Sequence, residues 1–225
     1  MLAMPFPVLT NDHLGKVRNI NRDRNMPDFE VHRVRGMFDI DGGAKALADR
    51  IDEICVEVSD AINKGARIIV LSDRHSNADL APIPSLLLTS AVHHHMVRER
   101  LRTQASLVVE AGDVREVHHV ALMIGCGATA VNPYLVLESA EDLARSGDYV
   151  SGITGEQAIA NVVYALGKGL LKVMSKMGIS TVSSYTGAQV FEAVGLSQDL
   201  IDRYFTSMSS VLGGVGLDVL AEEIR

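Results

Sequence analysis

The sequence predicts an α/β protein: a parallel sheet with flanking helices, incomplete and barrel-like or three-layered, followed by a mainly helical C-terminal segment. Short runs of β-branched residues alternate with amphipathic helical patterns between residues 29 and 134, which is the pattern of βαβ units. After Pro133 helical segments dominate. Gly and Ser are frequent from Gly147 to Gly155, so we expect a linker there.

The first unit begins with a predicted strand over 29–41 that ends at a Gly-Gly pair. A helix is expected next, because apolar residues recur at three- and four-residue spacing before Gly65. Those residues are Leu47, Ile51, Ile54, Cys55, Val58 and Ile62.

The later units repeat this alternation. Residues 67–73 form a short apolar run typical of a strand that is buried on both faces of a parallel sheet. Two prolines then precede a helical pattern that extends to about Gln104. A strand at 105–112, a helix-like stretch at 113–128 and a brief strand at 129–134 complete the series.

Polar residues stand where the predicted strands end. In parallel α/β folds, binding sites gather at the carboxyl ends of strands. We therefore single out five polar candidates at those ends, which are Ser72, Asp73, Arg74, Glu110 and Asn132. A simpler interpretation of the LSDR stretch is an ion pair between Asp73 and Arg74 with loop capping, and the sequence has no GxSxG elbow of a serine hydrolase.

Composition excludes several classes of function. A net charge of −7 and a pI near 5.6 argue against a nucleic-acid-binding surface. The sequence contains no run of about 18 uncharged apolar residues and no secretion signal, so we expect a cytoplasmic protein without a membrane span. Cys55 and Cys126 form neither a disulfide framework nor a CxxC pair, and reduced core thiols are expected.

Two histidine clusters invite a metal-site hypothesis. His93, His94 and His95 point about 100° apart on a helix, so one ion cannot bind all three. His118 and His119 would complete a composite site only if the two helices packed together. The alternative is that these imidazoles bond to carboxylates or carbonyls at helix contacts; a pH-sensitive or substrate-facing role is a third option.

The segment 172–196 is the most suggestive for ligand binding. A Ser/Thr cluster follows Gly178 and precedes a helix. Hydroxyls and free N–H groups at such a place favour a flavin or a phosphate. A capped helix start without any ligand explains the same residues. The Gly-x-Gly at Gly125 lacks the full dinucleotide fingerprint and is better explained by close helix packing.

Three stretches resemble the large subunit of bacterial glutamate synthase: LSDR, the run from Ala81 to Leu135, and the run from Lys168 to Thr206. The resemblance covers the chain from about Pro5 to its end. It implies that residues 1–147 are the later part of the family's central domain, and that residues 148–225 are a linker and the beginning of its FMN-binding (β/α)8 barrel. The family pattern is incomplete here, as in an excised piece.

The resemblance also implies function. The family enzyme uses FMN and a 3Fe-4S cluster to form L-glutamate from L-glutamine and 2-oxoglutarate. This chain lacks the nucleophilic cysteine and the cluster cysteines, so we expect a structural, inactive piece with no catalytic residue, no metal ligand and no bound cofactor. MSKMGIST resembles the first flavin-barrel strand and its loop, which implies FMN contacts at four adjacent residues and one weaker candidate: Met177, Gly178, Ile179, Ser180 and Gln189.

Partners follow from the same resemblance. They are the remaining domains of the large subunit and a reductase subunit or ferredoxin; the sequence does not decide between NADPH, NADH and ferredoxin as electron donor. A homodimer would cover the surface that truncation leaves open. The alternative function is a free-standing α/β protein that binds a small molecule at its strand ends, and a metal-dependent hydrolase that uses the histidines is a third hypothesis.

Overall fold

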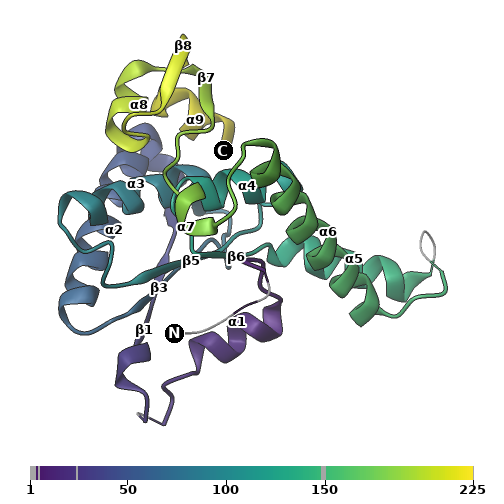
Figure 1. Cartoon of the computed structure of the whole chain (residues 1–225). Helices are drawn as coiled ribbons and strands as arrows, with labels where there is room; N and C mark the ends of the chain where they lie inside the picture. The colour runs from purple at the N-terminus through teal and green to yellow at the C-terminus, as the bar shows by residue number, and fades with distance from the viewer. Residues whose placement is uncertain (1–3, 5, 24, 148–150, 225) are drawn as a thin grey trace.

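A four-stranded parallel sheet forms the centre of the protein (Figure 1). The computed structural model describes residues 4, 6–23, 25–147 and 151–224. The strand order is β1-β3-β5-β6. The strands span Val31–Arg35 (β1), Ile68–Ser72 (β3), Ser106–Glu110 (β5) and Ala130–Asn132 (β6). The α/β class with a parallel sheet and flanking helices is confirmed.

Three helices connect these strands, and shorter elements surround them. The connecting helices are α2 (Gly43–Asn63), α3 (Ser85–Arg98) and α4 (Val117–Gly125). The N-terminal part also contains α1 (Asn11–Arg18), the 3-10 turns η1 (Pro27–Phe29) and η2 (Ile40–Gly42), and an antiparallel pair of strands, β2 (Met37–Asp39) and β4 (Leu80–Pro82).

Helix α2 forms where its apolar spacing predicts. All six of the predicted core residues on it are buried. Gly65 follows with a φ of 109°, a conformation that side chains with a Cβ rarely adopt. The helix therefore ends where the sequence requires it to end.

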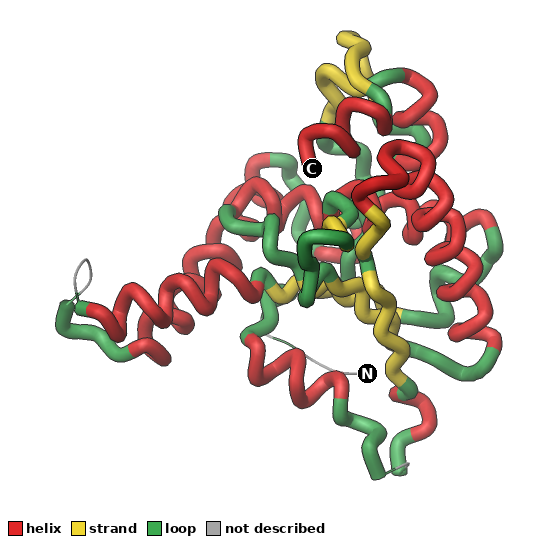
Figure 2. The backbone as a smooth tube through the Cα atoms, turned by 180° about the vertical axis from the view of Figure 1, so that it is seen from behind, coloured by secondary structure: helices red, strands yellow, loops and turns green. Residues whose placement is uncertain are grey.

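The two faces of the sheet are covered by different parts of the chain. Ile69 and Leu107 belong to the cluster that packs under α2 and α3. Ile68, Val70 and Val108 face the other way and pack against Leu14 of α1 and its neighbours. Figures 1 and 2 show α1 on the side of the sheet opposite to α2, α3 and α4. The N-terminal segment thus covers the face that the connecting helices leave open.

The strand predicted over 29–41 is wrong as a single element. It divides at Gly36, whose N–H donates to the Ser72 carbonyl at 2.8 Å and whose carbonyl accepts from the Ile83 N–H at 2.9 Å. The backbone therefore leaves β1 there and pairs with β4. The helix predicted to reach Gln104 also ends earlier, at Arg98, where Arg100 follows with a φ of 59°.

The C-terminal segment is mainly helical, as predicted, but it includes a small parallel sheet. Its elements are α5 (Tyr134–Ser146), α6 (Gly155–Lys176), α7 (Val182–Tyr185), β7 (Glu192–Leu196), α8 (Gln198–Tyr204), β8 (Ser209–Val215) and α9 (Leu217–Ile224). Helices α5 and α6 pack together as a hairpin that projects from the body (Figures 1 and 2). The predicted linker at 147–155 joins them, and residues 148–150 lie outside the described part.

The strand predicted at MSKMGIST is wrong. Helix α6 continues to Lys176 and ends in a Schellman motif, in which the Ile179 N–H donates to the Met174 carbonyl and the Gly178 N–H to the Ser175 carbonyl. Gly178 has a φ of 71°, which suits this ending. The apolar spacing along α6, with Leu170 and Met174 buried, explains why these residues form a helix and not a strand.

By length and composition alone, α6 could cross a membrane. Core helices of folded domains can be equally long and apolar. Here α6 packs against both α4 and α5 and carries three lysines. Its surroundings are those of a helix at the surface of a folded domain.

Candidate functional site

Three of the five polar candidates meet on one face of the sheet, at the carboxyl ends of neighbouring strands. Ser72 is the register partner of Glu110, and Glu110 is the register partner of Asn132. Side chains of register partners point to the same face. All three are buried. The predicted gathering of polar residues at the strand ends is confirmed for this set.

Glu110 is the centre of the cluster. Its side chain is 2% exposed and accepts three hydrogen bonds, from Ser72 Oγ at 2.6 Å, Arg33 Nη2 at 3.2 Å and Arg74 Nε at 2.7 Å. A buried carboxylate requires such partners, because burial without them is costly. The two guanidinium groups and the hydroxyl keep this carboxylate satisfied.

Arg74 extends the cluster to the helix that follows β6. Its Nη2 donates to Glu138 Oε1 at 2.6 Å, and its guanidinium carbon lies 4.0 Å from the centre of the Tyr134 ring. Glu138 also accepts from Asn11 Nδ2 at 2.9 Å. Asn132 Nδ2 donates to Asn11 Oδ1 at 3.0 Å. The cluster therefore ties β3, β5, β6, α5 and the start of α1 to one another.

The ion pair expected between Asp73 and Arg74 is wrong, because Arg74 pairs with Glu110 and Glu138 instead. Asp73 is 7% exposed and accepts from the Gly112 N–H at 2.7 Å. Burial raises the pKa of Asp73 to about 6. Burial and the nearby Asp73 charge raise the pKa of Tyr134 to about 12. Asp73 thus changes charge closer to neutral pH than an ordinary aspartate.

Three further residues of the cluster were not predicted: Arg33, Tyr134 and Glu138. Arg33 lies within β1 rather than at its end, so a rule based on strand ends passes over it. Tyr134 and Glu138 lie in the first turns of α5, directly after β6. The start of a helix that follows a parallel strand lies at the carboxyl edge of the sheet, and that placement could have identified both residues.

Little space is left beside this cluster. The cavity beside it, lined in part by Ser72, Asp73, Ser85 and Glu110, has a volume of about 10 Å³. That is room for about one water molecule, whereas ligand pockets span several hundred Å³. Among the described residues, no group of three His, Cys, Asp or Glu side chains could hold a metal ion.

The residues predicted to contact FMN lie in two places. Met177, Gly178, Ile179 and Ser180 form the turn after α6, where Met177 is 48% exposed. Gln189 has a φ of 55° and lines a separate cavity of about 60 Å³ between α3, α4, α7 and the β7 region. The four turn residues do not line that cavity. Contact with FMN stays a prediction.

The Ser/Thr cluster forms a capped helix start. The Thr181 hydroxyl accepts from the Ser184 N–H at 3.4 Å, at the N-terminus of α7. This is the ligand-free alternative that the sequence left open.

Three of the five clustered histidines have polar side-chain contacts. His93 Nδ1 accepts from Arg102 Nε at 3.0 Å, and His95 Nε2 lies 2.7 Å from the Ser59 hydroxyl on α2. Burial and the Arg102 charge lower the pKa of His93 to about 4. His119 lies 3.3 Å from the carboxylate of Glu116. His95 thus makes a contact between two helices, with a hydroxyl as its partner, and the carboxylate contact of His119 lies within its own helix.

Solved structures similar to this chain share its fold. A flavocytochrome b2 bound to benzoylformate gives a TM-score of 0.51 at 12% identity, over 82% of this chain and 45% of that one. A flavocytochrome b2 bound to sulfite gives a TM-score of 0.51 at 17% identity, over 92% and 43%. These likenesses concern the β/α-barrel-like fold alone.

Sequence relatives are longer proteins. Glutamate synthase [NADH] of Schizosaccharomyces pombe is 43% identical over 98% of this chain and 10% of its own length. Glutamate synthase [NADPH] large chain of Bacillus subtilis is 42% identical over 97% and 14%. The chloroplastic ferredoxin-dependent glutamate synthase of Spinacia oleracea is 38% identical over 99% and 14%. This chain therefore spans about a tenth to a seventh of the length of these relatives.

A family model described as glutamate synthase central domain matches residues 1–197. The match continues past residue 148, and the division of the chain at 147/148 stays a prediction. Together with the relatives, it shows that this chain belongs to the glutamate synthase central domain family.

Proposed function

We propose that this chain is the central-domain part of a glutamate synthase that forms two L-glutamate molecules from L-glutamine and 2-oxoglutarate. The relatives named as glutamate synthases support this proposal, because they match nearly all of the chain at 36–43% identity. The chain corresponds to only 10–14% of the length of the three relatives described above. The reacting groups therefore belong to other parts of the enzyme.

The role proposed for this part is to position the catalytic domains. The observation that carries it is the buried Glu110 carboxylate, whose two oxygens both accept hydrogen bonds from charged or hydroxyl donors. A carboxylate held this way has no free oxygen to act as a base or a nucleophile. By itself the chain is inactive under this proposal.

The chain does not fit an iron–sulfur cluster. Cys55 and Cys126 are both buried, and burial raises the pKa of each thiol to about 11. Cluster ligands are thiolates, usually several together. Any 3Fe-4S centre of the complete enzyme is therefore held by cysteines of other domains.

An edge contact with FMN at the turn after α6 is part of this proposal. A Cβ added at Gly178 would meet no atom within 4 Å, so the turn after α6 leaves an open approach to the backbone. Met177 and Ser180 are exposed beside it. FMN, when bound, would supply hydride chemistry to the complete enzyme, and this turn would contribute one wall of its surroundings.

The proposed partners are the other domains of the same large chain, together with a reductase subunit or ferredoxin, in the cytoplasm. The relatives include NADH, NADPH and ferredoxin forms, so their names leave the donor open.

A chimeric enzyme tests the proposal. The matching segment of the Bacillus subtilis large chain is replaced by this chain, and glutamate formation from glutamine and 2-oxoglutarate is measured. We expect activity to be restored relative to the same large chain without the segment, and to be lost with the Glu110→Gln chain. A folded chimera that carries its flavin but forms no glutamate would contradict the proposed role.

A further inference from the structure

Helix α6 carries an unusual concentration of positive charge. Three of the chain's six lysines, Lys168, Lys172 and Lys176, follow one another at four-residue spacing. No Asp or Glu occurs between residues 157 and 191, although the chain as a whole has a net charge of −7. Residues four apart lie on one side of a helix. The lysines therefore form one basic surface.

This surface is open to solvent. The three lysines are exposed, and within the described part of the chain none of them forms an ion pair. Tyr164 and Leu171 lie beside them with 57% and 47% of their surface exposed. Lys168 Nζ lies 5.5 Å from the centre of the Tyr164 ring. We call these five residues the basic face of α6.

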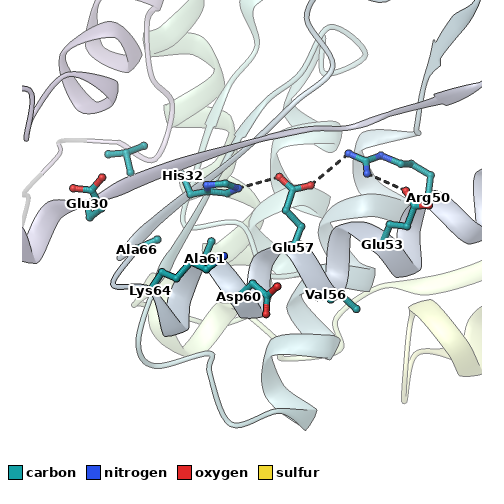
Figure 3. Close-up of a pocket in the computed structure, with 11 residues that line it drawn as sticks. Glu30, His32, Arg50, Glu53, Val56, Glu57, Asp60, Ala61, Lys64 and Ala66 are labelled. Atoms are coloured by element: carbon teal, nitrogen blue, oxygen red, sulfur yellow. Dashed lines mark hydrogen bonds and ion pairs between the residues drawn. The ribbon is translucent and has the colours of Figure 1, made fainter.

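The opposite charge gathers in a groove on the other side of the molecule. The groove lies between the edge strand β1 and helix α2 and has a volume of about 520 Å³. Figure 3 shows its residues, with Glu57 between His32 and Arg50. Four acidic residues line the groove against two residues that are always cationic: Glu30, Glu53, Glu57 and Asp60 against Arg50 and Lys64.

The groove offers exposed acidic side chains beside an exposed apolar residue. Glu53, Glu57 and Asp60 recur at helical spacing along α2. The Glu53 side chain is 66% exposed although it pairs with Arg50. Val56 lies between the acids and is 60% exposed. The groove thus offers carboxylates one helical turn apart beside an apolar contact, which is the counterpart of the basic face of α6.

We propose that the basic face of α6 in one copy of this chain docks into the α2 groove of a second copy. Figure 1 shows α2 and the α5–α6 hairpin beyond opposite edges of the sheet, so the basic face of one copy cannot reach its own groove. The contact is head-to-tail and generates a ring or an open chain of copies. This self-association does not depend on the proposed enzymatic role.

The partner is a second copy because both complementary surfaces are present in this chain. In the proposed contact Lys168 and Lys172 lie against the acidic row of α2 that begins at Glu53, while Leu171 covers Val56. Elsewhere the net charge of −7 makes two copies repel each other. The association therefore has one orientation and weakens with salt, because its attraction is carried by exposed charges.

Sedimentation velocity of the full 225-residue chain tests the proposal. We expect the sedimentation coefficient to rise with protein concentration, and the dissociation constant to increase at least about tenfold from about 50 mM to about 300 mM salt. A wild-type chain that stays monomeric over the whole concentration range would overturn the proposal.

Two charge-reversed variants make the test specific. Lys168→Glu with Lys172→Glu reverses the basic face, and Glu53→Lys with Asp60→Lys reverses the groove. Each variant alone is expected to stay monomeric. An equimolar mixture is expected to recover association, because the intact groove of the first variant then meets the intact basic face of the second, and the two reversed surfaces are complementary as well. Persistent association of either variant, or a mixture that stays monomeric, would refute the assigned contact.

A matched control carries the same change of charge elsewhere. Lys16→Glu with Lys45→Glu alters two exposed lysines outside both surfaces. It is expected to associate more like the wild type than like the α6 variant. Thermal unfolding of each variant verifies that these surface changes leave the fold intact, and equal loss of association in the control would count against the proposal.

Discussion

Ser72 and Glu110 are 38 residues apart in the sequence, yet Ser72 Oγ lies 2.6 Å from Glu110 Oε2. The parallel register of β3 and β5 makes them direct partners. Two arginines complete the carboxylate's environment. The cluster at the carboxyl edge of the sheet therefore depends on a contact between distant parts of the chain. Its loss should lower the stability of the whole fold.

Glu110→Gln tests how much this cluster contributes to the free energy of unfolding. The change removes the carboxylate that pairs with Arg33 and one of the two carboxylates that pair with Arg74, so we expect the free energy of unfolding in urea to fall by about 2–3 kcal/mol. The control is Glu116→Gln, whose carboxylate is 64% exposed and should cost less than about 0.5 kcal/mol. Equal effects of the two changes would mean that the cluster does not hold the fold.

Asp73 predicts a pH dependence of stability. Its pKa in the folded protein is about 6, above its ordinary value of 3.8. Between these values the folded state binds more protons than the unfolded state, so this residue's contribution to stability falls as pH rises. Asp73→Asn removes this decrease in stability with rising pH, because asparagine does not ionise. The variant should gain on the order of 3 kcal/mol relative to the wild type between about pH 4 and pH 7, as measured by urea unfolding. A constant difference across this range would be the contrary result.

Gly169 is required for the approach of α6 to α4. A Cβ added there would overlap the side chain of Val117. Gly169→Ala should therefore lower the free energy of unfolding by about 1–3 kcal/mol.

The control is Gly15, in α1, where an added Cβ meets no atom within 4 Å. Gly15→Ala is therefore expected to stabilise the protein slightly, by up to about 1 kcal/mol, since alanine favours a helix. Thermal unfolding compares the two, and similar changes would argue against tight packing at Gly169.

The histidine run predicts that the chain does not bind zinc. His93 and His95 are held by Arg102 and Ser59 on different neighbours. Elemental analysis of the purified chain, without an affinity tag, is expected to find far less than one zinc per chain. One equivalent of zinc that disappears in His95→Ala would show that the histidines form a metal site after all.

The fold could be predicted where local pattern and tertiary contact agree. The spacing of Leu47 to Ile62 fixes α2, and Gly65 ends it. The strand at 67–73 is apolar enough to be buried on both faces. These elements can be predicted from their own residues alone, because the local pattern determines which side chains are buried.

The failures come from long-range contacts and helix endings. Gly36 turns the chain away from β1 because Ser72 and Ile83 offer it partners, which the local sequence does not reveal. At Gly178 the family resemblance predicts a strand, whereas the apolar spacing of α6 followed by a glycine is typical of a helix ending, which is what the structure shows.

The candidate site was predicted in part for the same reason. The position of Glu110 at a strand end could be predicted from the alternation of strands and helices. Its partners Arg33 and Glu138 depend on strand order and register, which only the assembled sheet defines.

The central claim is that this chain supplies the framework of a glutamate-forming enzyme and none of its reacting groups. In the most direct measurement, the purified 225-residue chain is incubated with glutamine, 2-oxoglutarate, FMN and a chemical reductant. Glutamate formation is followed, and bound flavin is detected by its visible absorbance. The account predicts no glutamate and no retained flavin after gel filtration. Catalytic turnover by the chain alone would contradict it.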